Sequence, residues 1–429
     1  MKRLLLLALL LIALPSPLLA AVAEAFPQPN GLRLIVESDE ATDIVAIDLL
    51  LDISADDEPA QHGGIRALTQ RLLMRGTTNE SGEFMARRLA AVGGVADATA
   101  GLDYVEIYAV VPSDGFEVAL ELLADAVRNP AFSSEEVDRQ KAVAIEAADA
   151  FRQDPFQETY LAFRDGFYGS HPYARPTFGE SVSLGSITRQ DIVAFHAAHY
   201  LPGKAVLAIC GGVDQARARR AVRSLLGDWG GGEAPPRPDT TVAPLASSEL
   251  VARELPTNLA YMVIGFPAPV ADAPDYYAMQ LIDGLLTGGS SARLPQVLRD
   301  QRSLAYHVSS FYPTLREPSH LAVYTATDAQ HLDLAKAAVL DVLADLCQEP
   351  VPDEELARAK RCLIGSYLLS HQRMKDQAFA LAWYELLGLG SNFEERYAAS
   401  IQAVTPAQVQ EAAQTFLQRF VLAITLPTG

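Results

Sequence analysis

Two pairs of side chains stand at spacings that could contribute to a metal site. His196 and His199 are three residues apart in a helical pattern, and His62 follows Glu58 by four residues. Imidazole and carboxylate groups are common ligands of Zn²⁺, but a catalytic zinc ion needs three protein ligands. Neither pair has a third ligand nearby, and the other histidines are scattered. We therefore interpret the pairs as parts of a solvated helix face and of a loop.

The three cysteines, Cys210, Cys347 and Cys362, are too few for a disulfide framework. Cys210 lies in an apolar strand pattern, which favours a role in core packing. Cys347 and Cys362 could pair in an oxidising compartment, and the sequence leaves that question open. No two cysteines have the spacing of a zinc finger.

The stretch Gly64–Thr77 predicts a short helix with two distinct faces, which starts at a glycine pair and ends at Gly76. Its apolar stripe consists of Ile65, Leu68, Leu72 and Leu73. A second face carries Ala67, Gln70 and Arg71, which are neighbours at i, i+3 and i+4. None of these three side chains is a ligand that zinc prefers.

Strands and amphipathic helices alternate along the rest of the chain. Strands are predicted at Leu32–Val36, Val45–Ile53, Val105–Val111, Lys204–Cys210, Leu259–Phe266, Ala305–Phe311, Leu321–Thr327 and Val421–Ile424. Helices are predicted at Ser81–Val92, Gly115–Val127, Ser134–Phe151, Thr188–Tyr200, Asp275–Leu286, Ala292–Gln301, Leu332–Leu346 and Pro352–Leu369. The small residues of Gly93–Gly101 are expected to form a bend between strands.

Both halves of the chain close in the same way, because Ile187–Asp191 and Val404–Gln408 each introduce a helix that a strand follows. This repetition predicts an α+β fold of two homologous domains, each an antiparallel sheet packed with helices. We place the domains at residues 26–230 and 246–429. A Gly- and Pro-rich linker at residues 231–245 separates them.

The composition and the N-terminus limit where the chain can act. With 53 acidic and 34 basic residues the net charge is −19, which disfavours binding to nucleic acids and anionic membranes. Residues 1–25 have the basic start, apolar run and small-residue cleavage sites (Ala21–Ala23 and Ala23–Ala25) of a signal peptide. We therefore expect a periplasmic or secreted protein, an uncleaved anchor being the alternative, with no later membrane span.

Several motifs in this order resemble the insulinase/pitrilysin family of zinc peptidases (inverzincins), in its two-subunit bacterial type. They are Gly64–Thr77, His171–Gly179, Ile187–Asp191 and Ser290–Tyr306, which together extend over most of the chain. The resemblance implies a bowl-like half of a clamshell peptidase. Active members carry His-x-x-Glu-His on the first helix, and a further Glu downstream completes the zinc site.

The chain departs from the family's pattern at every one of these positions. The motif positions fall on Ala67, Gln70 and Arg71, and the downstream ligand position falls on Ala147. Glu146 is adjacent, but a shift of one residue turns a helical side chain by about 100°. The resemblance is therefore to the inactive subunit, with a degenerate zinc site, no metal of its own and no catalytic residue in this chain.

Arg299 and Tyr306 match a different part of the family's pattern. The resemblance implies that such a pair reaches the substrate held in the active site of the partner subunit. Guanidinium and phenol groups can both hydrogen-bond a peptide carbonyl or a developing oxyanion. The alternative is that Arg299 lies on a helix surface and Tyr306 packs in a strand. Arg293 is expected to be structural.

The sequence therefore predicts the non-catalytic subunit of a periplasmic heterodimeric zinc metalloendopeptidase. Its partner would be an insulinase-like chain with His-x-x-Glu-His and the zinc ion, and its substrate a peptide. A silent scaffold or peptide-binding protein of the same fold is one alternative. An active zinc peptidase with unrecognised ligands is the other.

Overall fold

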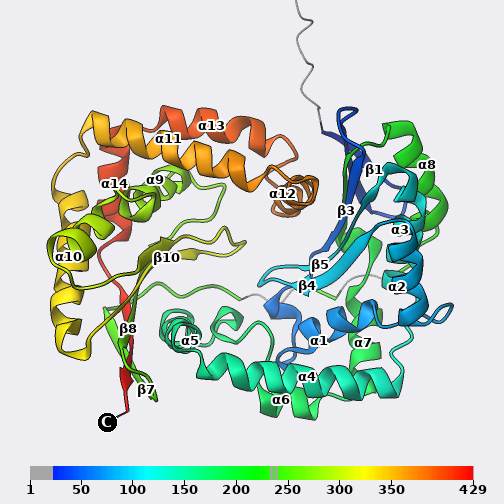
Figure 1. Cartoon of the computed structure of the whole chain (residues 1–429), viewed down its shortest axis with the longest axis horizontal. Helices are drawn as coiled ribbons and strands as arrows, with labels where there is room; N and C mark the ends of the chain where they lie inside the picture. The colour runs from blue at the N-terminus through cyan, green and yellow to red at the C-terminus, as the bar shows by residue number, and fades with distance from the viewer. Residues whose placement is uncertain (1–22, 232–234, 237–239, 429) are drawn as a thin grey trace, which may run out of the picture.

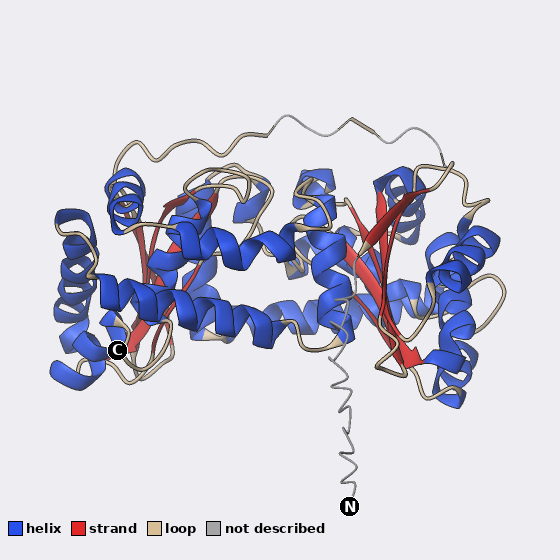
Figure 2. Cartoon of the chain, turned by 90° about the horizontal axis from the view of Figure 1, so that it is seen from above, coloured by secondary structure: helices blue, strands red, loops and turns tan. Residues whose placement is uncertain are grey.

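The computed structural model describes residues 23–231, 235–236 and 240–428. The expected signal segment up to residue 22 and parts of the expected linker lie outside the described residues. Two β-sheets lie apart along the long axis of the molecule, with helices between and around them (Figures 1 and 2). The predicted α+β class with two similar halves is confirmed.

The first sheet belongs to the N-terminal half and has six strands. Their spatial order is β1 (Glu24–Pro27), β2 (Arg33–Ser38), β6 (Ala205–Gly211), β3 (Ile44–Leu51), β5 (Val105–Pro112) and β4 (Val95–Ala100). Strands β2 and β6 run parallel, and the other neighbours are antiparallel.

The second sheet has five strands and repeats the order of β2 to β4 in the first sheet, without a counterpart of β1. Its order is β7 (Glu249–Leu255), β11 (Val421–Pro427), β8 (Ala260–Ala268), β10 (Ser319–Thr327) and β9 (Val308–Phe311). The pair β7 and β11 is again parallel and the rest is antiparallel. In each half, the last strand therefore lies between the first two strands of the repeat, so the sheets are mixed rather than purely antiparallel.

The helices of the first half are α1 (Ile65–Leu73), α2 (Gly82–Ala91), α3 (Phe116–Arg128), α4 (Ser134–Gln153), α5 (Pro155–Tyr168), α6 (Ser181–Ser186), α7 (Arg189–His199) and α8 (Gln215–Leu226). Those of the second half are α9 (Tyr276–Thr287), a π-helical segment (Pro295–Gln301), α10 (Leu332–Gln348), α11 (Asp353–Ser370), α12 (Met374–Leu386), α13 (Phe393–Ala403) and α14 (Pro406–Phe416). Within the described ranges, no helix has the length and apolar character needed to cross a bilayer.

The closing helices of the two halves begin with the same device. Thr188 caps α7 and Thr405 caps α14, and each hydroxyl accepts a hydrogen bond from the backbone N–H three residues later. The side chains of Asp191 and Gln408 in turn accept a hydrogen bond from the backbone N–H of the capping threonine. This reciprocal pair of bonds forms a capping box in both helices. The predicted helix-then-strand endings are therefore confirmed as α7 with β6 and α14 with β11.

Each half contributes one helix that packs on the sheet of the other half. Helix α12, from the C-terminal half, covers β3 and β6 of the first sheet. Its buried Ala378 and Leu381 belong to the same apolar core as Ala46 and Ala208 of these strands. Because burial of apolar area is the main stabilising contribution to folding, this face of the first sheet depends on α12.

Helix α5, from the N-terminal half, packs in turn on β7, β8 and β11 of the second sheet. Phe163 of α5 lies directly over Gly265 of β8, where a Cβ in place of the glycine hydrogen would come within 2.2 Å of the ring. Gly166 of α5 likewise lies against Val251 and Val421. Glycines at these positions let the helix approach the sheet closely.

The structure differs from the local predictions at several places, of which two bear on the site. Residues 95–100, expected to form a bend, form the edge strand β4, because backbone pairing with β5 does not require large side chains. Helix α5 was not predicted, since its buried residues include Glu158, Thr159 and Arg164 as well as apolar side chains, so no single apolar stripe marks it.

Candidate functional site

The start of helix α1 is held by a buried carboxylate and a close contact between backbones. Glu58 accepts hydrogen bonds from the N–H groups of Gly64 and Arg66, each 3.2 Å long, and so satisfies two free donors of the helix. Gly64 has a φ of +92°, a left-handed conformation that favours glycine. It packs against Gly179, which precedes α6. Glu58 is therefore a helix cap and not a metal ligand paired with His62.

The predicted apolar stripe of α1 is confirmed. Ile65, Leu68, Leu72 and Leu73 are all at most 1% exposed and join the core of the first half. Packing of this apolar stripe holds α1 in one orientation. The orientation in turn determines where Ala67, Gln70 and Arg71 point.

The other face of α1 is divided between the core and a cavity. Ala67 and Arg71 line a cavity of about 690 Å³. Gln70 is fully buried behind them: its side-chain oxygen accepts a 2.7 Å hydrogen bond from the Tyr200 hydroxyl, and its amide nitrogen donates to the Glu106 carbonyl. Both ends of the Gln70 amide are therefore engaged within this chain.

The downstream motif position lies at the same cavity. Ala147 on α4 lines it, together with Ala144 and Ala148, whereas the adjacent Glu146 is exposed and is not among the lining residues. The structure thus brings three of the four degenerate motif positions to one cavity. Their side chains are two methyl groups and one guanidinium, which do not fit a zinc ion. In the described ranges, no three His, Cys, Asp or Glu residues gather in a way that could hold a metal.

The histidine pairs do not converge. The Nε2 atom of His196 lies 2.9 Å from the carbonyl oxygen of Val127, and burial lowers the pKa of His196 to about 4. The Nδ1 atom of His199 lies 3.3 Å from a carboxylate oxygen of Asp57 instead. Burial alone would raise the pKa of Asp57, but the hydrogen bond from His199 and the charge of Lys204 outweigh it and lower that pKa. The two histidines therefore serve separate local contacts.

Arg299 and Tyr306 lie in the other half and do not line this cavity. Arg299 is exposed, and its Nε donates a 2.8 Å hydrogen bond to the neighbouring Asp300. Tyr306 is 99% exposed in the loop before β9, so the alternative of a packed strand residue is wrong. Arg293 forms a bidentate pair with Glu355 at 2.8 and 2.9 Å, which agrees with its expected structural role.

Three arginines on or near the helices of the cavity were not singled out from the sequence. Arg66 is fully buried, and its Nη1 donates to the carbonyl oxygens of Gly101 and Tyr104. Arg152 at the end of α4 and Arg164 on α5 line the cavity. No spacing rule marks Arg66, and Arg164 could be placed only once α5 was known.

The cysteines take no part in the site. All three carry free thiols, so Cys347 on α10 and Cys362 on α11 are not bonded to each other. Cys210 is fully buried in the core, as expected, and burial raises the pKa of its thiol.

Two family models match consecutive segments of the chain. The model described as "Insulinase (Peptidase family M16)" matches residues 33–180, and the one described as "Peptidase M16 inactive domain" matches residues 186–363. Together they extend over most of the described residues.

Curated relatives of similar length cover nearly the whole chain. An uncharacterised zinc protease of Bacillus subtilis is 23% identical over 401 residues, which is 93% of this chain and 97% of the relative. One of Mycobacterium tuberculosis is 26% identical over 395 residues, or 91% and 90% of the two chains.

Solved structures share the fold. A peptidase M16 inactive domain from Pseudomonas fluorescens superposes with a TM-score of 0.87 at 23% identity, covering 95% of this chain and 98% of its own. A protease from Helicobacter pylori gives 0.89 at 19% identity, covering 95% and 100%.

Proposed function

The chain belongs to the insulinase family of peptidases, peptidase family M16, as an inactive-type member. From this premise we propose that it is the non-catalytic subunit of a heterodimeric zinc metalloendopeptidase. Its partner would be a chain of similar length with His-x-x-Glu-His, which would hold the zinc ion. The two bowl-like chains would enclose a chamber for a peptide substrate.

The observation that carries this proposal is a contrast between the two halves. In the first half the family helix is kept and packed, but its chemical face holds Ala67, Gln70 and Arg71. In the second half, Tyr306 exposes nearly its whole side chain, and Arg299 has Asp300 as its one side-chain partner among the described residues. Side chains that a chain does not use for its own packing are available to a substrate or a partner.

Arg299 and Tyr306 would act on a peptide bound in the partner's site. The guanidinium would donate hydrogen bonds to a peptide carbonyl, and the Tyr306 hydroxyl would donate to the oxygen on which negative charge develops. Zinc bound by the partner would supply the activated water. This chain's own share is to orient the substrate and to stabilise charge.

The proposal is tested by mixing the purified chain with its His-x-x-Glu-His partner and zinc, and measuring peptide cleavage. We expect Arg299→Ala and Tyr306→Phe each to lower kcat/KM by about 10²-fold, the usual effect of removing an oxyanion donor. Size-exclusion chromatography should show normal assembly of both variants. Arg302→Ala, a nearby exposed arginine, is the control and should leave the rate unchanged.

Two results would contradict the proposal in different ways. Normal rates for both variants would favour the silent scaffold or peptide-binding protein. Robust cleavage by this chain alone would favour an active peptidase with unrecognised ligands.

The proposed location is the periplasm or the exterior, after removal of the signal peptide. Strand β1 begins at Glu24 and pairs with β2, with Glu24 opposite Val36. Of the two expected cleavage points, the one after Ala23 leaves this strand whole, whereas the one after Ala25 removes half of it. The pairing therefore favours cleavage after Ala23.

A further inference from the structure

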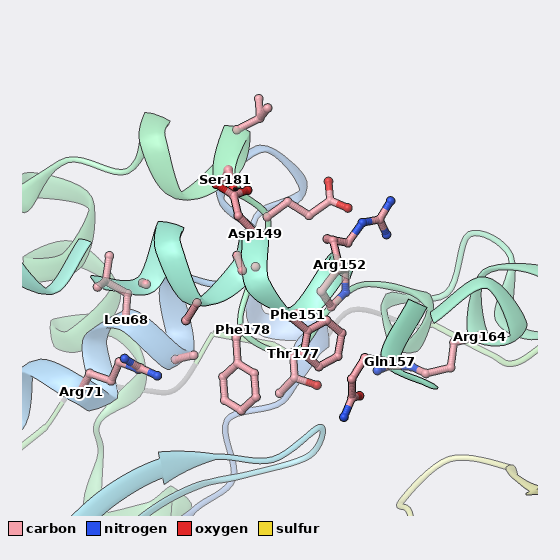
Figure 3. A pocket seen from close by; sticks show the side chains of 18 of the residues that line it. Leu68, Arg71, Asp149, Phe151, Arg152, Gln157, Arg164, Thr177, Phe178 and Ser181 are labelled. Atoms are coloured by element: carbon pink, nitrogen blue, oxygen red, sulfur yellow. Dashed lines mark hydrogen bonds between the residues drawn. The ribbon is translucent and has the colours of Figure 1, made fainter. Parts of the chain in front are cut away.

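The cavity at the degenerate motif combines apolar walls with an accessible opening. Helices α1, α4 and α5 and the segment 176–182 surround it. Its apolar lining includes Leu68, Phe151 and Phe178, and Figure 3 shows the Phe178 ring projecting between Arg71 and Gln157. Phe178 is 44% exposed, a large aromatic surface that the fold itself leaves uncovered. A volume of about 690 Å³ is in the range of small-ligand sites.

Three arginines line the cavity, and Arg71 is the one whose guanidinium forms no ion pair or hydrogen bond among the described residues. Arg152 forms an ion pair with Glu158, 3.2 Å from Nε to Oε2. Arg164 donates to the carbonyl oxygens of Tyr173 and Arg175. Within the described part of the chain, Arg71 has neither an acidic partner nor a hydrogen-bond partner.

The acidic lining residues do not neutralise Arg71. Asp149 accepts a hydrogen bond from the Ser181 hydroxyl, and in Figure 3 its side chain lies beside Ser181, away from the Arg71 guanidinium. Glu180 also lines the cavity and forms no ion pair with Arg71. A free guanidinium at a concave, partly apolar surface produces a positive local field although the whole chain is acidic.

From these contacts we infer that the cavity binds a peptide carboxylate, with the anion on Arg71 and the neighbouring apolar side chain against Phe151 and Phe178. A guanidinium pairs with a carboxylate through two parallel hydrogen bonds. One free guanidinium balances one negative charge, which suits a carboxylate better than the double charge of a phosphate. The carboxylate can be a peptide C-terminus or an Asp or Glu side chain, because both present the same group.

This binding is a property of the chain alone and does not depend on the proposed pairing with a catalytic subunit. At the motif position where active family members have a metal-binding side chain, this chain has the Arg71 guanidinium. We expect that positive group to select peptides that present a carboxylate.

The test is calorimetric titration of the purified chain with three short peptides that share an apolar C-terminal residue. One has a free C-terminal carboxylate, one is amidated, and one is amidated with a glutamate beside the apolar residue. We expect the free acid to bind at least tenfold more tightly than the plain amide. The glutamate peptide then shows whether a side-chain carboxylate serves as well as a C-terminal one.

Variants locate the site. Arg71→Gln should abolish the preference for the acid, and Arg71→Lys should keep part of it, because a lysine retains the charge but not the two-pronged geometry. Arg75→Gln is the matched control, since Arg75 is an exposed arginine just beyond α1 that does not line the cavity.

Equal affinity for all three peptides in the unaltered chain would overturn the inference without any variant. Binding of the acid that survives Arg71→Gln would also overturn it, because the anion would then lie elsewhere. Neither result bears on the role of Arg299 and Tyr306, which is measured with the partner present.

Discussion

At the scale of single residues, the geometry of the site depends on a contact between two glycines. Gly64 and Gly179 have φ angles of +92° and +81°. A Cβ on Gly64 would lie 2.7 Å from the Cα of Gly179, and one on Gly179 would lie 2.6 Å from the carbonyl oxygen of Gly63. These neighbours are backbone atoms, which cannot rotate away as a side chain can. The contact sets the distance between α1 and the segment that carries Phe178.

Gly64→Ala should therefore destabilise the protein by about 2–4 kcal/mol, since it adds both a clash and a strained φ. Urea unfolding followed by circular dichroism would measure the loss. Gly185→Ala is the control, because nothing lies within 4 Å of a Cβ at that position and its φ is ordinary. If the two variants unfold at the same urea concentration, the glycine contact does not hold the site.

At the scale of elements, α12 is attached to the first sheet by a buried charge cluster as well as by apolar packing. The Nζ atom of Lys375 lies 2.6 Å from a carboxylate oxygen of Glu106 on β5. Asp48 on β3 is fully buried nearby, and burial, with the Glu106 charge, raises its pKa well above the usual range. Lys375 is the cation that opposes this rise, and it also lies 4.6 Å from the Tyr108 ring centre.

Lys375→Met should cost about 2–4 kcal/mol, because it leaves buried carboxylates without a counter-charge. The cost should shrink as the pH falls from 7 to 5. Lys375 lowers the pKa of Asp48, so its removal raises that pKa further, and the folded variant binds a proton there more readily than the folded parent. Unfolding midpoints of the variant and the parent at both pH values test this, with Lys336→Met, a lysine of α10 paired with Asp333, as the control. A deficit that grows at pH 5 would contradict the argument.

At the scale of the whole molecule, a buried histidine joins the two halves. His320 on β10 is fully buried, and its ring nitrogens lie 2.9 and 2.7 Å from the hydroxyls of Tyr160 and Tyr168 on α5. Burial, with a smaller contribution from the Arg164 charge, lowers the pKa of His320 to about 3. The histidine is therefore neutral in the folded protein at every pH where the protein is expected to work.

Between pH 6.5 and about 3, the unfolded state should take up a proton at His320 that the folded state does not. Stability should then fall with decreasing pH, by up to about 1.4 kcal/mol per pH unit from this residue. Urea unfolding from pH 7 to pH 4.5 measures the slope. His320→Gln should flatten it, whereas His307→Gln, an exposed histidine, should not. An unchanged slope in His320→Gln would assign the acid sensitivity to other groups.

The parts of the fold that the sequence predicts are those whose signal is local. The apolar stripe of α1 and the helix-then-strand endings of the two halves follow from spacing and side-chain chemistry alone. Helix α5 was missed because its environment is the opposite sheet, far away in the sequence, and its buried polar residues hide the pattern. The Arg71 cavity was missed for the same reason, since α5 forms one of its walls. The exposure of Tyr306 also depends on tertiary structure. The local sequence does not predict it, because an aromatic residue before a strand usually packs against its neighbours.

The reciprocal packing of α5 and α12 has a consequence for how this kind of chain can change over generations. Although the two sheets are repeats, neither repeat covers both faces of its own sheet. A gene split at the linker would encode two fragments, each with one apolar sheet face uncovered. Recombination that replaced one repeat would have to supply a matching helix for the sheet it did not replace. The two repeats are therefore expected to be inherited together, as one unit.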